Sequence, residues 1–161
     1  MLSFCWKNII FVMRKVNFKL RKYRAGDEVE MADVFRAAVD GCYAYYDEKQ
    51  IAAWRDGVSC DVLKEKSRNR CVVAEVDGKI VGFGNGEEGY LDMLYVHPSF
   101  QGAGIGSAIC DRLEGARTLT YASEAVLPFF VGRGYKVICR RQVERKGVAL
   151  HNYAAEKTIG T

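Results

Sequence analysis

Three glycines stand at every second position from Gly102 to Gly106, directly before apolar residues at helical spacing. Glycine lets a backbone approach a ligand closely because it has no Cβ atom, and the N–H groups that begin a helix attract anions. Ser107 adds a hydroxyl group beside them. Residue types in this order are suited to binding a phosphate or a pyrophosphate. The segment 101–107 is therefore the first candidate site.

Two familiar nucleotide motifs do not fit these glycines. The Walker pattern requires Gly-Lys where Ser107 stands. The dinucleotide pattern GxGxxG requires glycine in place of Ser107 or Ile109, and it follows the first strand of a βαβ unit. The pattern Gln-x-x-Gly-x-Gly does fit, with Gln101, Gly104 and Gly106 lying between a predicted strand and a predicted helix. From the motif alone, a glycine-rich turn without a ligand stays an open alternative.

The composition is that of a globular domain. The chain has 161 residues, of which 49% are hydrophobic and 27% charged, which suits a single domain with a sizeable core. Six cysteines are spaced irregularly without a CxxC pair, and there are only two histidines. This argues against a zinc cluster, so we expect no metal site and free thiols in a reducing cytoplasm.

The net charge of +4 is unevenly distributed. The first 24 residues carry seven basic side chains and no acid, whereas residues 27–61 carry nine acids and three bases. The basic segment lacks clustered aromatics, so we expect a solvated face and no nucleic-acid partner. The apolar start is too short to span a bilayer and lacks the features of a signal peptide. We expect residues 1–15 to be an N-terminal extension and 16–161 to form one domain.

The first part of the chain has mixed element signals. Alternating apolar residues predict a strand over 16–23. Asp27, with Glu30 three residues later, has the spacing of a capping box, and Gly41 can end the helix that follows. Short helical pieces are expected over 48–54 and 61–67.

The middle and the end of the chain are richer in strands. The pairs Asp77-Gly78 and Asn85-Gly86 indicate hairpin turns. They predict a three-strand meander over 70–76, 79–84 and 89–96. After the glycine segment and its helix we expect a strand over 119–122, a helix over 124–132 with Ser123 as N-cap, and strands over 135–142 and 147–159. The predicted fold class is α+β, with a mixed, mostly antiparallel central sheet of about six to seven strands flanked by helices.

Three segments of the chain resemble the GNAT superfamily of acyl-CoA-dependent N-acetyltransferases. The resemblance covers roughly residues 17–158 in the family's order of elements, and it is closest to the YafP-like branch of small bacterial members. It is carried by "LDMLYVHPSFQGAGIGSAICDRL", "ASEAVLPFFVGRGYKV" and "VNFKLRKYRAGDEVEMADVF".

The resemblance implies acetyl-CoA as the acyl-donor co-substrate. The pantetheine arm is expected along the backbone of Leu94, Tyr95 and Val96, with the Val96 N–H donating to the thioester oxygen as it becomes an oxyanion. Phe129 and Phe130 are expected to wall the end of this arm. The pyrophosphate is expected on the backbone and hydroxyl groups of Gln101, Gly102, Ala103, Gly104, Ile105, Gly106 and Ser107.

The implied reaction is direct attack of an amine on the thioester in a ternary complex, which requires two proton transfers. Asp92 is the candidate acceptor of the amine's proton, although a purely structural aspartate is an equal alternative. Glu87 and Glu88 are expected to be solvated. Many family members have tyrosine at the position of Phe130, and phenylalanine cannot donate a proton. The acid for the leaving thiolate is therefore unassigned.

The acceptor pocket is expected near the first helix and the segment after it. Tyr43, Tyr46 and Trp54 are the candidate substrate-binding residues, and such aromatics suit an apolar or cationic amine. The alternative is that they only pack the helix onto the sheet. The acids of residues 27–61 favour a cationic amine, and His151 can reach the region from the last strand.

The predicted function is that of a cytoplasmic N-acetyltransferase acting on a small-molecule amine, without a membrane partner. Two alternatives stay open. One is an acetyltransferase of protein N-termini or lysines, and the other is an acyl-CoA-binding sensor or interaction module with little or no turnover. Exposed strand edges also permit a homodimer.

Overall fold

A computed structural model describes residues 15–160, so the predicted extension lies, apart from its last residue, outside the described part of the chain. Its elements in chain order are β1 (Lys19–Lys22), α1 (Glu28–Asp40), α2 (Glu48–Asp56), α3 (Cys60–Lys66), β2 (Arg70–Val76), β3 (Lys79–Glu87), β4 (Tyr90–Val96), a 3-10 turn (Pro98–Phe100), α4 (Ile105–Leu113), β5 (Arg117–Ala122), α5 (Leu127–Gly132), β6 (Lys136–Arg145) and β7 (Val148–Thr158).

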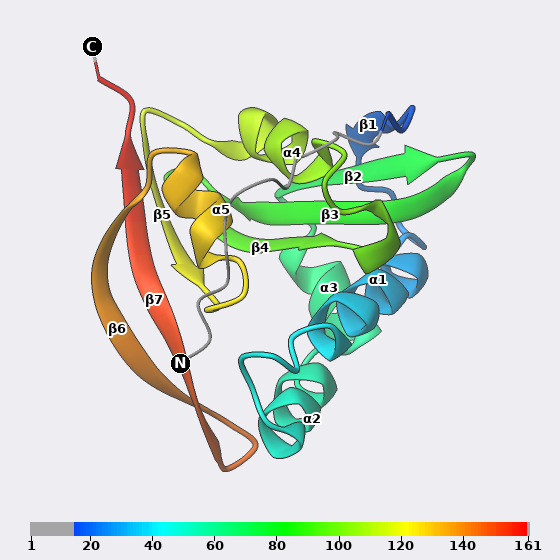
Figure 1. The fold of residues 1–161 in the computed structure, drawn as a ribbon. Helices are drawn as coiled ribbons and strands as arrows, with labels where there is room; N and C mark the ends of the chain where they lie inside the picture. The colour runs from blue at the N-terminus through cyan, green and yellow to red at the C-terminus, as the bar shows by residue number, and fades with distance from the viewer. Residues whose placement is uncertain (1–14, 161) are drawn as a thin grey trace.

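Within the described part of the chain, seven strands form one sheet in the order β1-β2-β3-β4-β5-β7-β6. Neighbouring strands are antiparallel except β4 and β5, which are parallel. Figure 1 shows β1 to β4 as one half of the sheet and β5 to β7 as the other, with the strands of the second half turned away from those of the first. The predicted fold class is confirmed.

Helices cover both faces of the sheet, and an apolar cluster fills each interface. On one face α1, α2 and α3 bury side chains such as Met31, Phe35 and Leu63 against the sheet. On the other face α4 and α5 bury Ile105, Ile109 and others. Removing this surface from water is the main force that holds the layers together. The site described below lies where the two halves of the sheet meet.

The predicted capping box at the start of α1 is wrong. Asp27 occupies the N-cap position but makes no side-chain cap hydrogen bond. Both of its carboxylate oxygens accept hydrogen bonds from the Arg21 guanidinium, at 2.7 and 3.0 Å. The Arg21 hydrogen bond lowers the pKa of Asp27 below its ordinary value. Glu30 accepts from the Ile80 N–H on β3 instead. The Asp27 carboxylate therefore binds Arg21 on β1 and not the N–H groups at the start of α1.

The second hairpin turn is also not where the sequence predicts it. Asp77 and Gly78 form the first turn as expected, with φ angles of 50° and 78°. Asn85 and Gly86, in contrast, are buried inside β3, which continues to Glu87. The chain turns at Glu88 and Gly89. Asn85 and Gly86 instead pair with β4 on either side of a bulge in that strand.

The remaining elements differ from expectation mainly in their ends. Ser123 does not cap α5, because that helix begins at Leu127 with Val126 in the N-cap position. The Ser123 carbonyl accepts from the N–H groups of Val126 and Leu127 in the turn before it. The first strand is shorter than expected, and β6 extends three residues further than expected.

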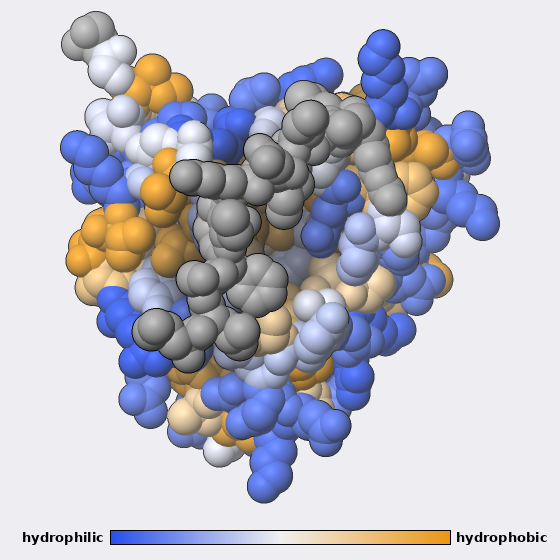
Figure 2. Space-filling view, in the orientation of Figure 1, coloured by the Kyte–Doolittle hydropathy of each residue, from blue (hydrophilic) through white to orange (hydrophobic). Residues whose placement is uncertain are grey.

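The outer surface is largely polar. Figure 2 shows hydrophilic side chains over most of the visible face and apolar ones gathered at the margin where β6 lies. Val137 and Ile138 on β6 are 46% and 58% exposed. Within residues 15–160 no helix is long and apolar enough to cross a bilayer, no three metal-binding side chains cluster, and the five cysteines are free.

Candidate active site

The strands β4 and β5 separate soon after they meet. Their ladder contains only the pairs Tyr90–Leu119 and Leu91–Thr120. On the other side of β4, the His97 N–H donates to the Val81 carbonyl on the preceding strand at 2.8 Å. The main-chain groups of successive residues in a strand point to opposite edges. Since the His97 N–H points to β3, the N–H and carbonyl groups of Val96 and Leu94 face the gap between β4 and β5. The Gln101 side chain accordingly donates to the Val96 carbonyl from that side, at 3.0 Å.

The glycine segment closes one end of this gap. Gly102 and Gly104 have φ angles of 76° and 83°, a left-handed conformation that other residues adopt at a cost. Gly104 is the N-cap of α4, so the N–H groups of the first turn have no partners inside the helix. These donors and the Ser107 hydroxyl line a cavity, and their chemistry fits a pyrophosphate.

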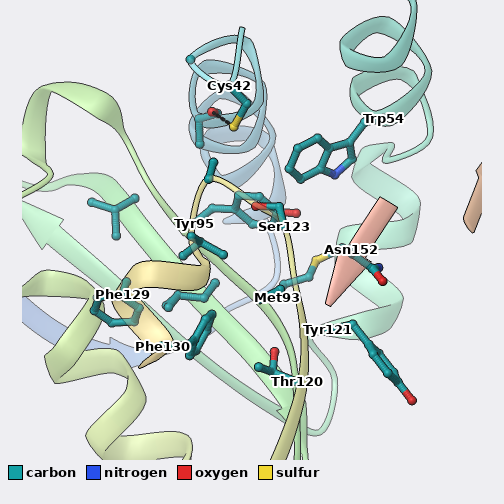
Figure 3. A pocket seen from close by; sticks show the side chains of 18 of the residues that line it. Cys42, Trp54, Met93, Tyr95, Thr120, Tyr121, Ser123, Phe129, Phe130 and Asn152 are labelled. Atoms are coloured by element: carbon teal, nitrogen blue, oxygen red, sulfur yellow. Dashed lines mark hydrogen bonds between the residues drawn. The ribbon is translucent and has the colours of Figure 1, made fainter. Parts of the chain in front are cut away.

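One cavity of about 1080 Å³ runs from the glycine segment along the open edge of β4 to the region of α1 and α2. All the predicted cofactor-binding residues line it except Ala103, which is 7% exposed and packs in the core under α4. Figure 3 shows Phe129 and Phe130 on one side of the cavity, with Trp54 and Asn152 on the opposite side. The cavity therefore joins the two predicted halves of the site.

Asp92 lies in this cavity because of the bulge in β4. The adjacent β3 residues Asn85 and Gly86 pair with Met93 and Leu91, so Asp92 is an extra residue in its strand. A bulge of this kind re-aims the side chain that it carries. A Cβ atom at Gly86 would lie 2.1 Å from the Tyr90 carbonyl oxygen, so the bulge requires glycine at that position.

The Asp92 carboxylate has two donors in the cavity wall. Lys66 Nζ at the end of α3 lies 2.5 Å from Oδ2, and the Tyr90 hydroxyl donates to Oδ1 at 3.2 Å. Burial raises the pKa of Tyr90, and the charge of Asp92 raises it further. The phenol therefore keeps its proton and its hydrogen bond at neutral pH. The Asp92 side chain is 23% exposed, so a ligand or a water can reach it.

Both members of the aromatic pair of α5 line the cavity, and Phe130 also packs in the core. Phe130 is only 2% exposed and packs on Tyr135, with ring centres 5.0 Å apart. Phe129 lies near the first turn of α4, where a Cβ atom at Gly106 would be 3.4 Å from the ring. The Tyr135 hydroxyl donates to Glu114, away from the cavity lining. A proton donor at the Phe130 position is thus absent, as the sequence predicts.

The far end of the cavity has an aromatic wall. Tyr46 is 4% exposed, and its hydroxyl donates to the His151 carbonyl while accepting from the Glu124 N–H, both at 3.0 Å. Burial raises the pKa of this hydroxyl. The Tyr46 ring stacks on the His151 ring and meets Trp54 edge-on at 5.5 Å. Two of the three predicted acceptor residues are therefore brought together, whereas Tyr43 is 79% exposed and lies outside the cavity.

The same end contains polar residues that the sequence did not single out. Among those that line the cavity are Lys66, Tyr90, Tyr121, Arg141, Arg145 and Asn152. They come from α3, β4, β5, β6 and β7, and only the alternation of Arg141, Val143 and Arg145 along β6 was a local signal for them. His151 lines the cavity too, and its Nε2 pairs with the Glu124 carboxylate.

Known proteins share both the sequence and the fold. Residues 42–157 match the family model described as the acetyltransferase (GNAT) domain. The chain is 31% identical over 141 residues to the uncharacterized N-acetyltransferase YafP of Escherichia coli K12, over 85% of this chain and 93% of that protein.

Two solved structures extend the comparison. A GCN5-related N-acetyltransferase from Rhodopseudomonas palustris has a TM-score of 0.84 and 28% identity, over 92% of this chain and 98% of its own. The PaiA N-acetyltransferase of Thermoplasma acidophilum, solved with coenzyme A, has a TM-score of 0.69 and 18% identity, over 89% of this chain and 100% of its own. The second likeness concerns the fold alone.

Proposed function

The chain belongs to the GNAT family of acetyl-CoA-dependent N-acetyltransferases, and from that membership we propose that it acetylates the amine of a small molecule by direct attack in a ternary complex. One observation carries the proposal. A single cavity connects the glycine segment, the open edge of β4 and the aromatic wall around Tyr46. Donor and acceptor can therefore be bound at the same time, with the reacting atoms near Asp92.

In this proposal the main chain holds the donor. The N–H groups at the start of α4 and the Ser107 hydroxyl bind the pyrophosphate, because helix N-termini favour anions. The N–H groups of Leu94 and Val96 bind the pantetheine arm and the thioester carbonyl along the edge that β5 leaves unpaired. A donor aimed at the developing oxyanion lowers the barrier of acyl transfer.

Asp92 is the proposed acceptor of the amine's proton. Its carboxylate stands in the cavity on a bulge and is held in place by Lys66 and Tyr90. A positioned base of this kind contributes about 10²- to 10⁴-fold to a rate. No side chain is proposed as the acid. A thiol with a pKa of roughly 8.5 leaves readily as a thiolate and can take its proton from water.

The acceptor end favours a small molecule over a protein segment. Tyr46 and Trp54 wall it from the α1–α2 side, and Leu150 and Asn152 wall it from β7. Tyr46 is fixed there by its two hydrogen bonds, one to β7 and one to the segment before α5. A pocket whose wall is built from side chains of several elements suits a compact amine.

The test is release of free coenzyme A from acetyl-CoA in the presence of a panel of small amines and of peptides with a free N-terminus or a lysine. We expect turnover with small amines at least about tenfold above hydrolysis, and none above hydrolysis with peptides. Turnover confined to peptides would replace the small-molecule acceptor with a protein. Binding of coenzyme A, seen as thermal stabilisation, without turnover of any amine would contradict the proposed activity.

A further inference from the structure

Two arginines on the cavity face of β6 have no acidic partner among residues 15–160. Arg141 and Arg145 alternate with Val143, and all three side chains line the cavity. Elsewhere in the fold Arg21 and Arg133 bind carboxylates at 2.7 and 2.8 Å. Within residues 15–160 neither Arg141 nor Arg145 lies in an ion pair with a carboxylate.

The charge of the cavity is therefore unbalanced. Of its lining residues Asp92 alone is acidic, and Lys66 already neutralises it. None of the acids between residues 27 and 61, which led us to expect a cationic acceptor, lines the cavity. Some of them bind partners outside it, such as Asp27 with Arg21. Arg141 and Arg145 thus leave an excess of positive charge.

This charge lies at the acceptor end and not at the pyrophosphate end. The Arg141 guanidinium stacks on the Tyr121 ring at 3.8 Å, and that ring lies 5.8 Å from the Tyr90 ring. Tyr90 begins β4, whereas Val96 at the other end of the strand adjoins the glycine segment. Six residues of extended strand span about 20 Å. Arg141 is therefore too remote to serve the pyrophosphate and is close to the Asp92 end.

An unsatisfied acceptor atom stands next to this arginine. Asn152 pairs with Arg141 across the β6–β7 ladder and also lines the cavity. Its side-chain Oδ1 is buried and accepts no hydrogen bond from the described residues. A buried carbonyl oxygen without a donor is costly, so a ligand that supplies an N–H is favoured there. The neighbours Arg141 and Asn152 thus suit an anion and an N–H group on one molecule.

We propose that the acceptor is an amine that also carries an anionic group, a carboxylate or a phosphate, which binds Arg141. Tyr121 holds the guanidinium plane by stacking, which leaves its N–H edge free for the two oxygens of such a group. The Asn152 side chain turns its Oδ1, which is buried in the free protein, toward an N–H of the same molecule. This inference rests on the proposed function, because it assigns the substrate class of the same site.

The test compares matched acceptors that differ only in charge. Coenzyme A release is measured with each amino acid and its carboxamide, and with aminoalkyl phosphates and the corresponding amino alcohols. We expect the anionic member of at least one pair to be preferred about 10- to 100-fold in kcat/KM, as for a charged hydrogen-bonded contact. Whether the carboxylates or the phosphates are preferred then identifies the anionic group of the acceptor.

Two variants test whether Arg141 causes the preference for the anionic acceptor. Arg141→Gln is expected to raise KM for the anionic acceptor by about 10-fold or more with little change for its neutral partner. Arg140→Gln is the matched control, because Arg140 is exposed on the same strand and lies outside this cavity. Thermal stabilisation by coenzyme A verifies that each variant is folded.

The outcomes separate the two proposals. Preference for the neutral member of every productive pair, or an equal loss in Arg140→Gln and Arg141→Gln, would overturn the anionic acceptor and leave the acetyltransferase proposal standing. Turnover of no amine, with coenzyme A still bound, would overturn the proposed function and the anionic acceptor with it.

Discussion

Asp92 and Lys66 meet at 2.5 Å across the space between β4 and α3. The contact joins Asp92, the bulged residue of β4, to Lys66, the last residue of α3 in the helical layer beside the sheet. It fixes the carboxylate beside the open edge of β4 while leaving it partly exposed.

Asp92→Asn is expected to lower kcat for acetyl transfer by at least about 100-fold, because an amide cannot accept the amine's proton. The affinity for coenzyme A should stay within about twofold, since the donor is held by main-chain groups elsewhere. Steady-state kinetics and calorimetry measure the two effects. Glu88→Gln, a change of an exposed acid in the neighbouring turn, is the control and should behave as wild type. A kcat within about threefold of wild type for Asp92→Asn would assign Asp92 a structural role only.

Gly86→Ala is expected to destabilise the bulge. The added methyl group would lie 2.1 Å from the Tyr90 carbonyl oxygen and 3.1 Å from the Leu91 Cα. Backbone atoms cannot move aside cheaply, so we expect a loss of about 1–3 kcal/mol in the free energy of unfolding. Denaturant titration measures it, and kcat should fall as well because Asp92 moves.

The control for that change is Gly115→Ala. A Cβ atom at Gly115 would have no neighbour within 4 Å, and its φ angle is not positive. We expect a change of less than about 0.5 kcal/mol there, as for ordinary surface substitutions. Equal stabilities of the two alanine variants would show that β4 tolerates a side chain opposite its bulge.

Gly104→Ala is expected to weaken coenzyme A binding. Gly104 has a φ angle of 83° at the N-cap of α4, and a residue with a Cβ atom pays about 1–2 kcal/mol in that conformation. The turn should relax and move the N–H groups of the first helical turn away from the pyrophosphate. Calorimetric titration with coenzyme A should give a dissociation constant about tenfold higher, and Gly115→Ala again serves as control. Unchanged affinity would mean that these donors do not bind the cofactor.

Glu114→Gln is expected to lower stability in a pH-dependent way. The Glu114 side chain is 5% exposed and accepts from Arg133, Lys157 and Tyr135. Burial alone would raise its pKa, but these hydrogen bonds bring the pKa below its ordinary value of 4.5. A carboxylate with a lowered pKa stabilises the fold above its unfolded value and loses that contribution as pH falls through its folded value.

The variant should therefore cost about 2–4 kcal/mol at pH 7, and the difference from wild type should shrink below about pH 4.5. Denaturant titrations at several pH values measure this. Asp111→Asn is the control, because Asp111 binds the same Arg133 but its side chain is 70% exposed. It should cost no more than about 1 kcal/mol. A pH-independent loss in Glu114→Gln would point to lost packing rather than lost charge.

Local signals explain how much of the fold the sequence predicted. Glycine pairs, alternation and helical spacing act over a few residues, so most elements were located to within a few positions. The exceptions needed a partner from elsewhere. Asp27 does not cap α1, because its carboxylate binds Arg21 on β1. The dipeptide Asn85-Gly86 is compatible with a hairpin turn and also with the close approach of a bulged strand, so the sequence alone does not distinguish the two.

The candidate site divides in the same way. The residues predicted for the cofactor lie in β4, in the glycine turn with the start of α4, and in α5, where short sequence motifs identify them. The acceptor end draws on β6 and β7 at positions such as Arg141 and Asn152, far from Tyr46 in sequence. Tyr43 was predicted there because it lies in the segment after the first helix, but its side chain is 79% exposed. No local pattern distinguishes it from Tyr46.

The two-pair ladder between β4 and β5 has a consequence for how this protein can change. The unpaired edge of β4 presents main-chain N–H and carbonyl groups, and every residue except proline has both groups. Substituting the side chains of Leu94 or Val96 by other strand formers would leave those groups in place. The acceptor end, in contrast, consists of side chains. Donor use should thus be robust to mutation while acceptor choice is readily altered, so new specificities are accessible by a few changes on β6 and β7 without rebuilding the cofactor groove.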